Sequence, residues 1–318
     1  MSKILITGGT GSFGTAMLTN LLKDDSIEEV RIFSRDEKKQ DDMRTKFKDK
    51  RVRYFIGDVR VMPSIERAMQ GVDAVFHASA MKQVPSCEEF PIEAMNTNIM
   101  GSANVLSLAM GFHIPKVVVL STDKAVMPVN TMGMTKALME KIALDTALRI
   151  EETGTNVCVT RYGNVMGSRG SVIPRFAEQI DNGKDVTITD SKMTRFMMNL
   201  SEAVELVKFA LYHGENGTTY VMKSPASTVK DIFLAISTMK GYTNYPFVEE
   251  GPRAGEKTHE TLVSSEEMTR SFDCGLYYAV PPLDSCHYTV PRPAYTSDTT
   301  KRLTLEETIS IIREGGVI

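Results

Sequence analysis

The stretch KILITGGTGSFGTAMLTNLL, residues 3–22, decides the fold class of this chain. Its first residues make a short apolar strand, and Gly8, Gly11 and Gly14 follow directly. A helical pattern of apolar residues then runs from Thr10 to Leu22. Glycines between a buried strand and a helix let the backbone approach a diphosphate, which the positive end of the helix dipole attracts. The stretch therefore predicts the first strand–turn–helix unit of an α/β protein.

The alternation of strand and helix continues through the first half of the chain. Strands are predicted at residues 30–33, 52–56, 74–77, 116–120 and 156–162, and helices at 36–47, 62–69, 91–110 and 135–151. The strands are apolar without alternation, which is typical of parallel strands buried on both faces. We therefore expect an α/β fold with a doubly wound parallel sheet.

The second half of the chain is less regular. Helices are predicted at residues 174–182, 201–213 and 229–239, with a short strand at 187–188, and residues 272–295 give no interpretable pattern. We expect residues 1–168 to form the dinucleotide-binding domain. Residues 169–318 should form most of a smaller interwoven substrate lobe, with about 196–225 packing back on the first domain.

Composition excludes several classes of protein. The chain has 318 residues, 37 basic and 40 acidic side chains and a formal net charge of -3. It has no basic block typical of nucleic-acid binding and no apolar run long enough for a membrane span. Four scattered cysteines without a C-x-x-C pattern favour reduced thiols over disulfides or a metal site. With no secretory signal at the N-terminus, a cytoplasmic location is expected.

The end of the second predicted strand bears on the choice of dinucleotide. Ser34 and Arg35 stand where a carboxylate would bind the ribose diol of NAD, and a guanidinium matches a 2′-phosphate. NADP is therefore favoured, although Asp36 and Glu37 follow closely. Asp58, after the third strand, is a candidate acceptor for the adenine amino group.

Further motifs resemble the extended short-chain dehydrogenase/reductase family, which has a Rossmann-type fold. TGGTGSFG fits its glycine pattern, Lys136 fits the lysine of its Y-x-x-x-K motif, and Met132 stands where the family usually has tyrosine. HASAMKQVP, STDKA, RYGNVMGSRGSVIP, TDSKMTRF and RAGEK, starting at residues 77, 121, 161, 189 and 253, are similar to nucleotide-sugar 4,6-dehydratases. The M-x-x-x-K variant resembles the branch that acts on UDP-N-acetylglucosamine and inverts C5 on the way to deoxy-amino sugars of surface polysaccharides. The resemblance also implies a homo-oligomer.

Such a reaction oxidises C4 of the hexose, which acidifies the C5 proton and lets the C6 hydroxyl leave. It needs one base and one acid beside a hydride carrier, and no metal. We assign Lys124 as the C5 base, neutral because burial, Lys136 and the nicotinamide lower its pKa, and Asp123 as the acid for O6. Because a thioether cannot take the C4 hydroxyl proton, we expect Asp123 to do so, with Thr122 hydrogen-bonded to O4.

The expected site residues fall into three groups. The catalytic group is Thr122, Asp123, Lys124, Met132 and Lys136. The cofactor group is Gly8, Thr10, Gly11, Ser12, Phe13, Gly14, Ser34, Arg35, Lys38, Asp58, Val59, Ala78, Ser79, Ala80, Lys82, Asn98, Lys136, Tyr162 and Asn164. The substrate group is Lys82, Asn164, Arg169, Ser171, Val172, Thr187, Thr189, Arg195, Arg253 and Glu256, and His77 is expected to pack as a neutral side chain.

Two other functions fit parts of the sequence. A UDP-sugar 4-epimerase on the same scaffold would return the hydride to C4 and would not need an adjacent acid and base aimed at C5 and C6. A non-catalytic NADP-binding protein would explain Met132, but it leaves Asp123, Lys124 and Lys136 without a role.

Overall fold

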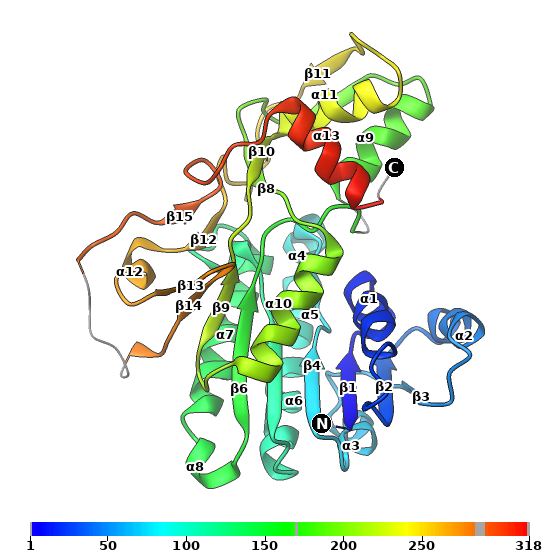
Figure 1. Ribbon diagram of the computed structural model, residues 1–318, viewed down its shortest axis with the longest axis vertical. Coiled ribbons are helices and arrows are strands. Elements are labelled where there is room, and N and C mark those ends of the chain that lie inside the picture. Colours follow the sequence, from blue (N-terminus) through cyan, green and yellow to red (C-terminus); the bar gives the residue numbers. More distant parts are fainter. Residues whose placement is uncertain (1, 169–170, 284–289, 317–318) are drawn as a thin grey trace.

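The apolar runs of the first half pair into one nine-stranded sheet in the computed structural model, which describes residues 2–168, 171–283 and 290–316 (Figure 1). Its strands are β1 (Lys3–Thr7), β2 (Glu29–Ser34), β3 (Val52–Ile56), β4 (Ala74–His77), β5 (Lys116–Leu120), β6 (Asn156–Arg161), β9 (Thr219–Met222), β13 (Phe272–Cys274) and β14 (Tyr277–Val280). The order is β13-β14-β9-β6-β5-β4-β1-β2-β3. All pairs from β3 to β9 are parallel, whereas β14 and β13 are antiparallel additions.

Helices cover both faces of this sheet, so the predicted doubly wound α/β fold is confirmed. One face packs on α1 (Ser12–Leu21), α2 (Glu37–Lys46) and α10 (Leu200–His213). The other packs on α3 (Met62–Met69), α6 (Gly101–Gly111) and α7 (Thr131–Ala147). The order reverses between β1 and β4, and their carboxyl ends therefore open a crevice of the kind in which such sheets bind ligands.

Short elements lie between these helices. They are α4 (Val84–Glu89), α5 (Pro91–Met95), the π-helical turn η1 (Asn96–Met100), the 3₁₀ turn η2 (Asp123–Ala125) and α8 (Ile150–Thr153). The continuous helix predicted over residues 91–110 is thus divided by η1, where Asn98 hydrogen-bonds outside the helix.

A smaller lobe sits above the carboxyl ends of the strands (Figure 1). Its helices are α9 (Val172–Asp181), α11 (Val229–Met239) and α13 (Leu305–Glu314), which share one apolar core. Three two-stranded sheets join it: β7 (Val186–Ile188) with β11 (Phe247–Glu249), β8 (Thr194–Phe196) with β10 (Ala226–Thr228), and β12 (Thr261–Val263) with β15 (Tyr295–Thr296). The short α12 (Ser265–Met268) follows β12. Between these segments, α10 and β9 return to the large sheet.

The segment without a sequence prediction, residues 272–295, supplies the β13–β14 hairpin at the sheet edge and the start of β15. Its residues 284–289 lie outside the described part of the chain. None of the helices in the described ranges is long and apolar enough to cross a bilayer.

Candidate active site

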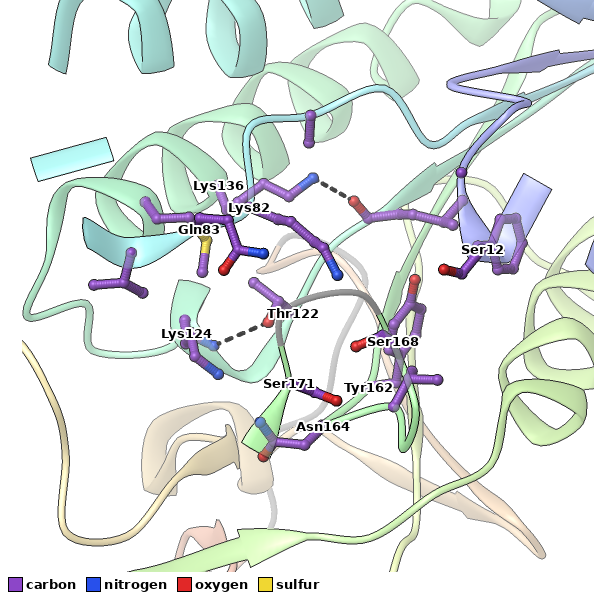
Figure 2. A pocket seen from close by; sticks show the side chains of 18 of the residues that line it. Ser12, Lys82, Gln83, Thr122, Lys124, Lys136, Tyr162, Asn164, Ser168 and Ser171 are labelled. Carbon is purple, nitrogen blue, oxygen red and sulfur yellow. Dashed lines mark hydrogen bonds between the residues drawn. The ribbon is translucent and has the colours of Figure 1, made fainter. Parts of the chain in front are cut away.

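A cleft of about 1220 Å³ lies between the carboxyl ends of the strands and the smaller lobe (Figure 2). Both lobes supply its walls. From the expected cofactor and catalytic groups, it is lined by Gly8, Thr10, Gly11, Ser12, Phe13, Gly14, Ser34, Arg35, Val59, Ala78, Ser79, Ala80, Lys82, Thr122, Lys124, Met132, Lys136, Tyr162 and Asn164. From the expected substrate group, Ser171, Val172, Thr187, Thr189, Arg195, Arg253 and Glu256 also line it.

The glycine-rich turn is shaped for a close ligand. Gly8 has a φ of +65°, and a Cβ there would lie 2.8 Å from the Ala78 carbonyl oxygen. A Cβ on Gly14 would lie 2.4 Å from the Gly9 carbonyl oxygen, so only glycine lets α1 start this close to the turn. The helix N-cap is Gly11, whose lack of a side chain leaves the first N–H groups of α1 without a side-chain cap. This arrangement fits a dinucleotide diphosphate.

At the end of β2 the carboxylate next to Arg35 in the sequence, Asp36, already has partners. Asp36 caps α2 by accepting from the Lys39 backbone N–H at 2.9 Å, and it pairs with Lys39 Nζ at 2.8 Å. Arg35 is more than half exposed and lines the cleft. Lys38 does not line the cleft, because it pairs with Asp42 along the exposed face of α2.

Asp58 lies just behind the cleft wall rather than in it. Both of its carboxylate oxygens accept from Arg60, at distances from 2.6 to 3.1 Å, and Arg35 Nη1 is 3.6 Å away. Burial would raise the pKa of Asp58, but the hydrogen bonds and charge of Arg60 lower it. Its neighbour Val59 does line the cleft.

A buried hydrogen-bond chain runs under the cleft. His77 contacts Thr7 Oγ1 through Nδ1 and Ser102 Oγ through Nε2, each at 2.8 Å. Ser102 donates its single hydroxyl proton to the Asn98 carbonyl at 2.7 Å, so His77 Nε2 carries the proton and Nδ1 accepts from Thr7. Burial, with a smaller contribution from Lys136, lowers the pKa of His77 to about 3, and the imidazole is neutral.

The chain continues to the helix that carries Met132. The Asn98 amide donates to Thr135 Oγ1 at 2.9 Å, and Thr135 donates to the Met132 carbonyl at 2.8 Å. Asn98 also pairs with both backbone groups of Met81. It is fully buried and lies outside the cleft wall, so its contact with a ligand would be indirect.

Met132 and Lys136 lie one turn apart on α7 and both face the cleft. Met132 is 4% exposed, and its thioether can neither take nor give a proton. Lys136 Nζ donates to the Leu120 carbonyl at 2.6 Å. Burial lowers the pKa of Lys136 to about 8, against the opposing attraction of Glu140.

The Thr122–Asp123–Lys124 turn follows β5 directly. Asp123 Oδ1 accepts from Thr122 Oγ1 at 2.7 Å and from Lys124 Nζ at 3.1 Å. The Asp123 side chain is fully buried and does not line the cleft, whereas Thr122 and Lys124 do. Thr122 Oγ1 therefore stands between the cleft and the Asp123 carboxylate, in position to pass a proton to it.

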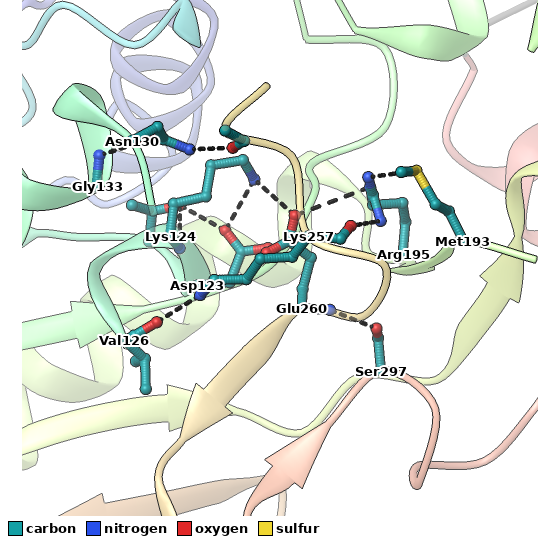
Figure 3. A network of polar contacts seen from close by, with 12 residues as sticks. Asp123, Lys124, Val126, Asn130, Gly133, Met193, Arg195, Lys257, Glu260 and Ser297 are labelled. Atoms are coloured by element: carbon teal, nitrogen blue, oxygen red, sulfur yellow. Dashed lines mark hydrogen bonds and ion pairs between the residues drawn. The ribbon is translucent and has the colours of Figure 1, made fainter. Parts of the chain in front are cut away.

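The expectation of a lowered pKa for Lys124 is wrong for this protein. Burial does act to lower it, but attraction to Asp123 and Glu260 outweighs burial and raises the pKa. Lys136, which was expected to lower the pKa of Lys124, is not among the groups that shift it. Lys124 is thus a charged ammonium between two carboxylates (Figure 3).

Sequence reasoning missed Glu260 and Lys257. Glu260 Oε1 lies 3.7 Å from Lys124 Nζ and 3.8 Å from Arg195 Nε. Lys257 Nζ donates to the Val126 carbonyl at 2.5 Å, which ties the smaller lobe to the turn after β5. Lys257 is the last residue of the RAGEK string, of which only Arg253 and Glu256 were expected in the site, whereas Glu260 belongs to no recognisable motif.

The substrate side of the cleft contains basic side chains and also buried oxygens that lack a hydrogen-bond partner. Burial lowers the pKa of Lys82. Arg195 donates to backbone carbonyls of its own lobe, including Thr194 at 2.8 Å, and Arg253 pairs with Glu250 at 3.5 Å. Buried oxygens without a hydrogen-bond partner in the described ranges belong to Asn164, Ser171 and Glu256. Arg169 lies outside the described residues.

The described part of the chain holds no cluster of three or more His, Cys, Asp or Glu side chains suited to a metal ion.

Comparison with known proteins places these features in context. A family model described as "Polysaccharide biosynthesis protein" matches residues 4–282. Proteins named UDP-glucose 4-epimerase from Rickettsia akari and Rickettsia felis are 51% and 52% identical over 319 residues, covering 96% of this chain and 93% of each relative.

Solved structures agree with the fold. The X-ray structure of Pen from Bacillus thuringiensis is 34% identical, with a TM-score of 0.94 over 100% of this chain and 98% of that one. DesIV, a dTDP-glucose 4,6-dehydratase from Streptomyces venezuelae solved with NAD and TYD bound, is 20% identical, with a TM-score of 0.75 over 98% of this chain and 97% of that one. At that identity the second likeness concerns the fold alone.

Proposed function

The chain belongs to the polysaccharide biosynthesis protein family, and from this premise we propose that it is an NADP-dependent 4,6-dehydratase of UDP-N-acetylglucosamine that inverts C5. The product would be a UDP-2-acetamido-2,6-dideoxy-L-hexos-4-ulose for surface glycans. The observation that carries the proposal is the Thr122–Asp123–Lys124 turn, where a buried carboxylate and an amine meet at the edge of the cleft. An enzyme that only epimerises C4 does not need this second proton-transfer pair.

Residues 1–168 would hold the cofactor and the smaller lobe the sugar nucleotide. The open N-terminus of α1 fits the diphosphate, and the Lys136 amine suits the ribose beside the nicotinamide. The bound cofactor supplies reversible hydride acceptance. NADP is favoured because Asp36 is engaged in capping α2, while Arg35 remains exposed at the cleft. Exchanging Arg35 for aspartate should reverse the order of NADP and NAD affinities in calorimetric titration, and an unchanged order would contradict this assignment.

The proton transfers follow from the turn after β5. During C4 oxidation, the O4 proton passes to Thr122 Oγ1 as the Thr122 proton passes to Asp123 Oδ1, across 2.7 Å. Lys124, once neutral, takes the C5 proton. Asp123 then returns its proton through Thr122 to the C6 oxygen, which leaves as water. With the hydride returned to C6, C5 takes a proton from a water molecule on the face opposite Lys124, which inverts that centre and leaves the abstracted proton on Lys124.

The deciding experiment incubates the purified protein with UDP-N-acetylglucosamine and follows the product by mass spectrometry. Loss of water supports a dehydratase. The 4-epimerase function is the second candidate, because the Rickettsia relatives carry that name, and it predicts an unchanged mass. An unchanged substrate would favour a non-catalytic protein.

The variant Asp123→Asn tests the proton path. It should abolish both C4 oxidation and water loss, because Asp123 is the only acceptor next to Thr122 in the turn. Asp145→Asn, at an exposed position on α7, serves as the matched control. Retained oxidation in the Asp123 variant would contradict the role of Asp123 as acceptor of the O4 proton.

We further propose a cytoplasmic homo-oligomer. Large apolar side chains are exposed on α5 and α7 and directly after α4, a pattern that suits helix packing between subunits. They include Phe90, Ile92, Met95, Met134 and Leu138. Light scattering after gel filtration tests this, and a monomeric mass would contradict it.

A further inference from the structure

The charge of Lys124 raises a question that the dehydration chemistry alone does not answer. As the C5 base, Lys124 must be neutral, yet it lies as an ammonium between the Asp123 and Glu260 carboxylates. Its side chain is only 22% exposed, and that exposure is toward the cleft that a bound substrate would fill. Its proton must therefore move to a neighbouring group rather than to bulk water.

Glu260 is held firmly in place to receive that proton. It precedes β12, and both of its backbone groups bond to the buried Ser297: the Glu260 N–H donates to Ser297 Oγ at 2.9 Å, and the Ser297 N–H donates to the Glu260 carbonyl at 2.8 Å. Its side chain lines the cleft but is 4% exposed. Glu260 Oε2 has no hydrogen-bond partner among the described residues, so it can accept a proton without breaking a contact.

The charged groups around Glu260 favour the sharing of one proton between Glu260 and Lys124. The charged groups that face it are Asp123 and Lys124 from the turn after β5, Arg195 from β8 and Lys257 from the loop before β12. Burial and repulsion by Asp123 raise the pKa of Glu260. The charges of Lys124, Arg195 and Lys257 lower it, but they do not outweigh the first two causes. Glu260 is thus a better proton acceptor than an ordinary surface carboxylate.

We propose that Glu260 accepts the Lys124 proton and so creates the neutral amine that serves as C5 base, a role that rests on the proposed dehydratase function. Oxidation at C4 sets the order of events: when Asp123 receives the O4 proton, Lys124 loses one of its two counter-charges, and burial is the cause that still raises the pKa of Glu260. One N–H bond of the ammonium then breaks, and an O–H bond forms on Glu260 once the two side chains close the 3.7 Å gap between Nζ and Oε1 to hydrogen-bond distance. The cluster's total charge is unchanged by this transfer. Lys124 becomes an ammonium again when it takes the C5 proton, and Glu260 gives its proton to water when the product leaves the cleft.

Glu260 is on this view a positioning residue for the proton, since it acts through Lys124 and not on the sugar. The arrangement explains why two carboxylates flank one lysine. Asp123 exchanges protons with the sugar through Thr122, while Glu260 stores the proton that Lys124 must give up.

The test compares Glu260→Gln with wild type and with Glu266→Gln, a control at an exposed position on α12. At pH 7, the Glu260→Gln variant should remove water from the substrate about a hundredfold more slowly than wild type, while C4 oxidation persists. Its dehydration rate should rise about tenfold per pH unit toward pH 10, because Lys124 then discharges before the substrate binds. Glu260→Asp should restore much of the activity at pH 7, and the control should match wild type throughout.

Two results would overturn the role of Glu260. Dehydration at pH 7 as fast as wild type, or faster, would mean that Glu260 merely stabilises the ammonium. An equal deficit at pH 7 and pH 10 would mean a structural role only.

If wild type itself removes no water from UDP-N-acetylglucosamine, the proposed function fails. Exchange of the C5 proton of a 4-keto-6-deoxy nucleotide sugar in D₂O then decides separately: exchange by wild type but not by Glu260→Gln supports the proton transfer, and any other pattern refutes it.

Discussion

Removal of the Arg161 guanidinium should destabilise the protein more than most single substitutions. Arg161 ends β6, is 6% exposed, and bonds to Glu140 of α7 at 2.6 and 2.8 Å and to Glu267 of α12 at 2.9 Å. Arg161→Met would leave the Glu140 and Glu267 carboxylates without the guanidinium that pairs with both of them. Breaking a buried ion pair in this way costs about 3–5 kcal/mol of unfolding free energy.

Urea denaturation at pH 7 measures this loss, provided that the slope of the transition is unchanged. Arg149→Met is the matched control, because its pair with Asp145 is exposed and should be worth less than about 1 kcal/mol. The pH dependence has a definite sign. Burial would raise the pKa of Glu267, but Arg161 lowers it, so wild type gains stability from this pair above the unfolded pKa and loses it as the pH falls. In the variant, protonation relieves the buried charge, and the deficit should shrink between pH 7 and pH 5. A loss below about 1 kcal/mol at pH 7, or a deficit that grows on acidification, would refute this reasoning.

Three further predictions concern the floor and wall of the cleft. Lys136 has a pKa of about 8 in the folded protein against 10.5 as its ordinary value, so stability should rise by about 3 kcal/mol relative to Lys136→Met between about pH 8 and pH 10.5, as measured by urea denaturation at each pH. His77, with a pKa of about 3 against 6.5, should make wild type lose stability relative to His77→Gln as the pH falls from about 6.5 to 3, again by denaturation. Gly14→Ala should weaken dinucleotide binding by about tenfold or more in calorimetry, because its Cβ would lie 2.4 Å from the Gly9 oxygen; unchanged affinity would mean that the turn relaxes freely.

Local sequence patterns were sufficient for strands β1 to β6 of the large sheet and for one half of the site, but not for β9, β13 and β14. The strands inside the sheet could be assigned because they are buried on both faces, as Val117–Leu120 shows, whereas the edge strand β3 is partly exposed. The glycine turn and the Thr122–Asp123–Lys124 turn were found because their function depends on residues adjacent in sequence. The helix predicted over 91–110 has the observed extent, because α5, η1 and α6 follow one another without a break; only its π-helical turn was not predicted, where the Asn98 side chain bonds to Met81 and Thr135.

Long-range contacts explain what the sequence did not reveal. Glu260 is 137 positions from Asp123, and nothing local indicates that a loop brings its carboxylate to Lys124. For the same reason the sign of the Lys124 pKa was misjudged, since Glu260 supplies part of the attraction. Lys38 looked like a phosphate ligand by proximity to Arg35, but the turn of α2 directs it toward Asp42.

The hydrogen-bond chain from Thr7 through His77 to the Met132 carbonyl runs in one direction, with every donor pointing toward α7. An incoming proton would have to protonate an imidazole that resists it down to about pH 3. The neutral His77 imidazole therefore does not carry hydrogen ions away from the underside of the cleft. An enzyme with such a floor keeps the same few protons in circulation at the sugar, which suits a reaction whose product differs from its substrate only by water and by the handedness of one carbon.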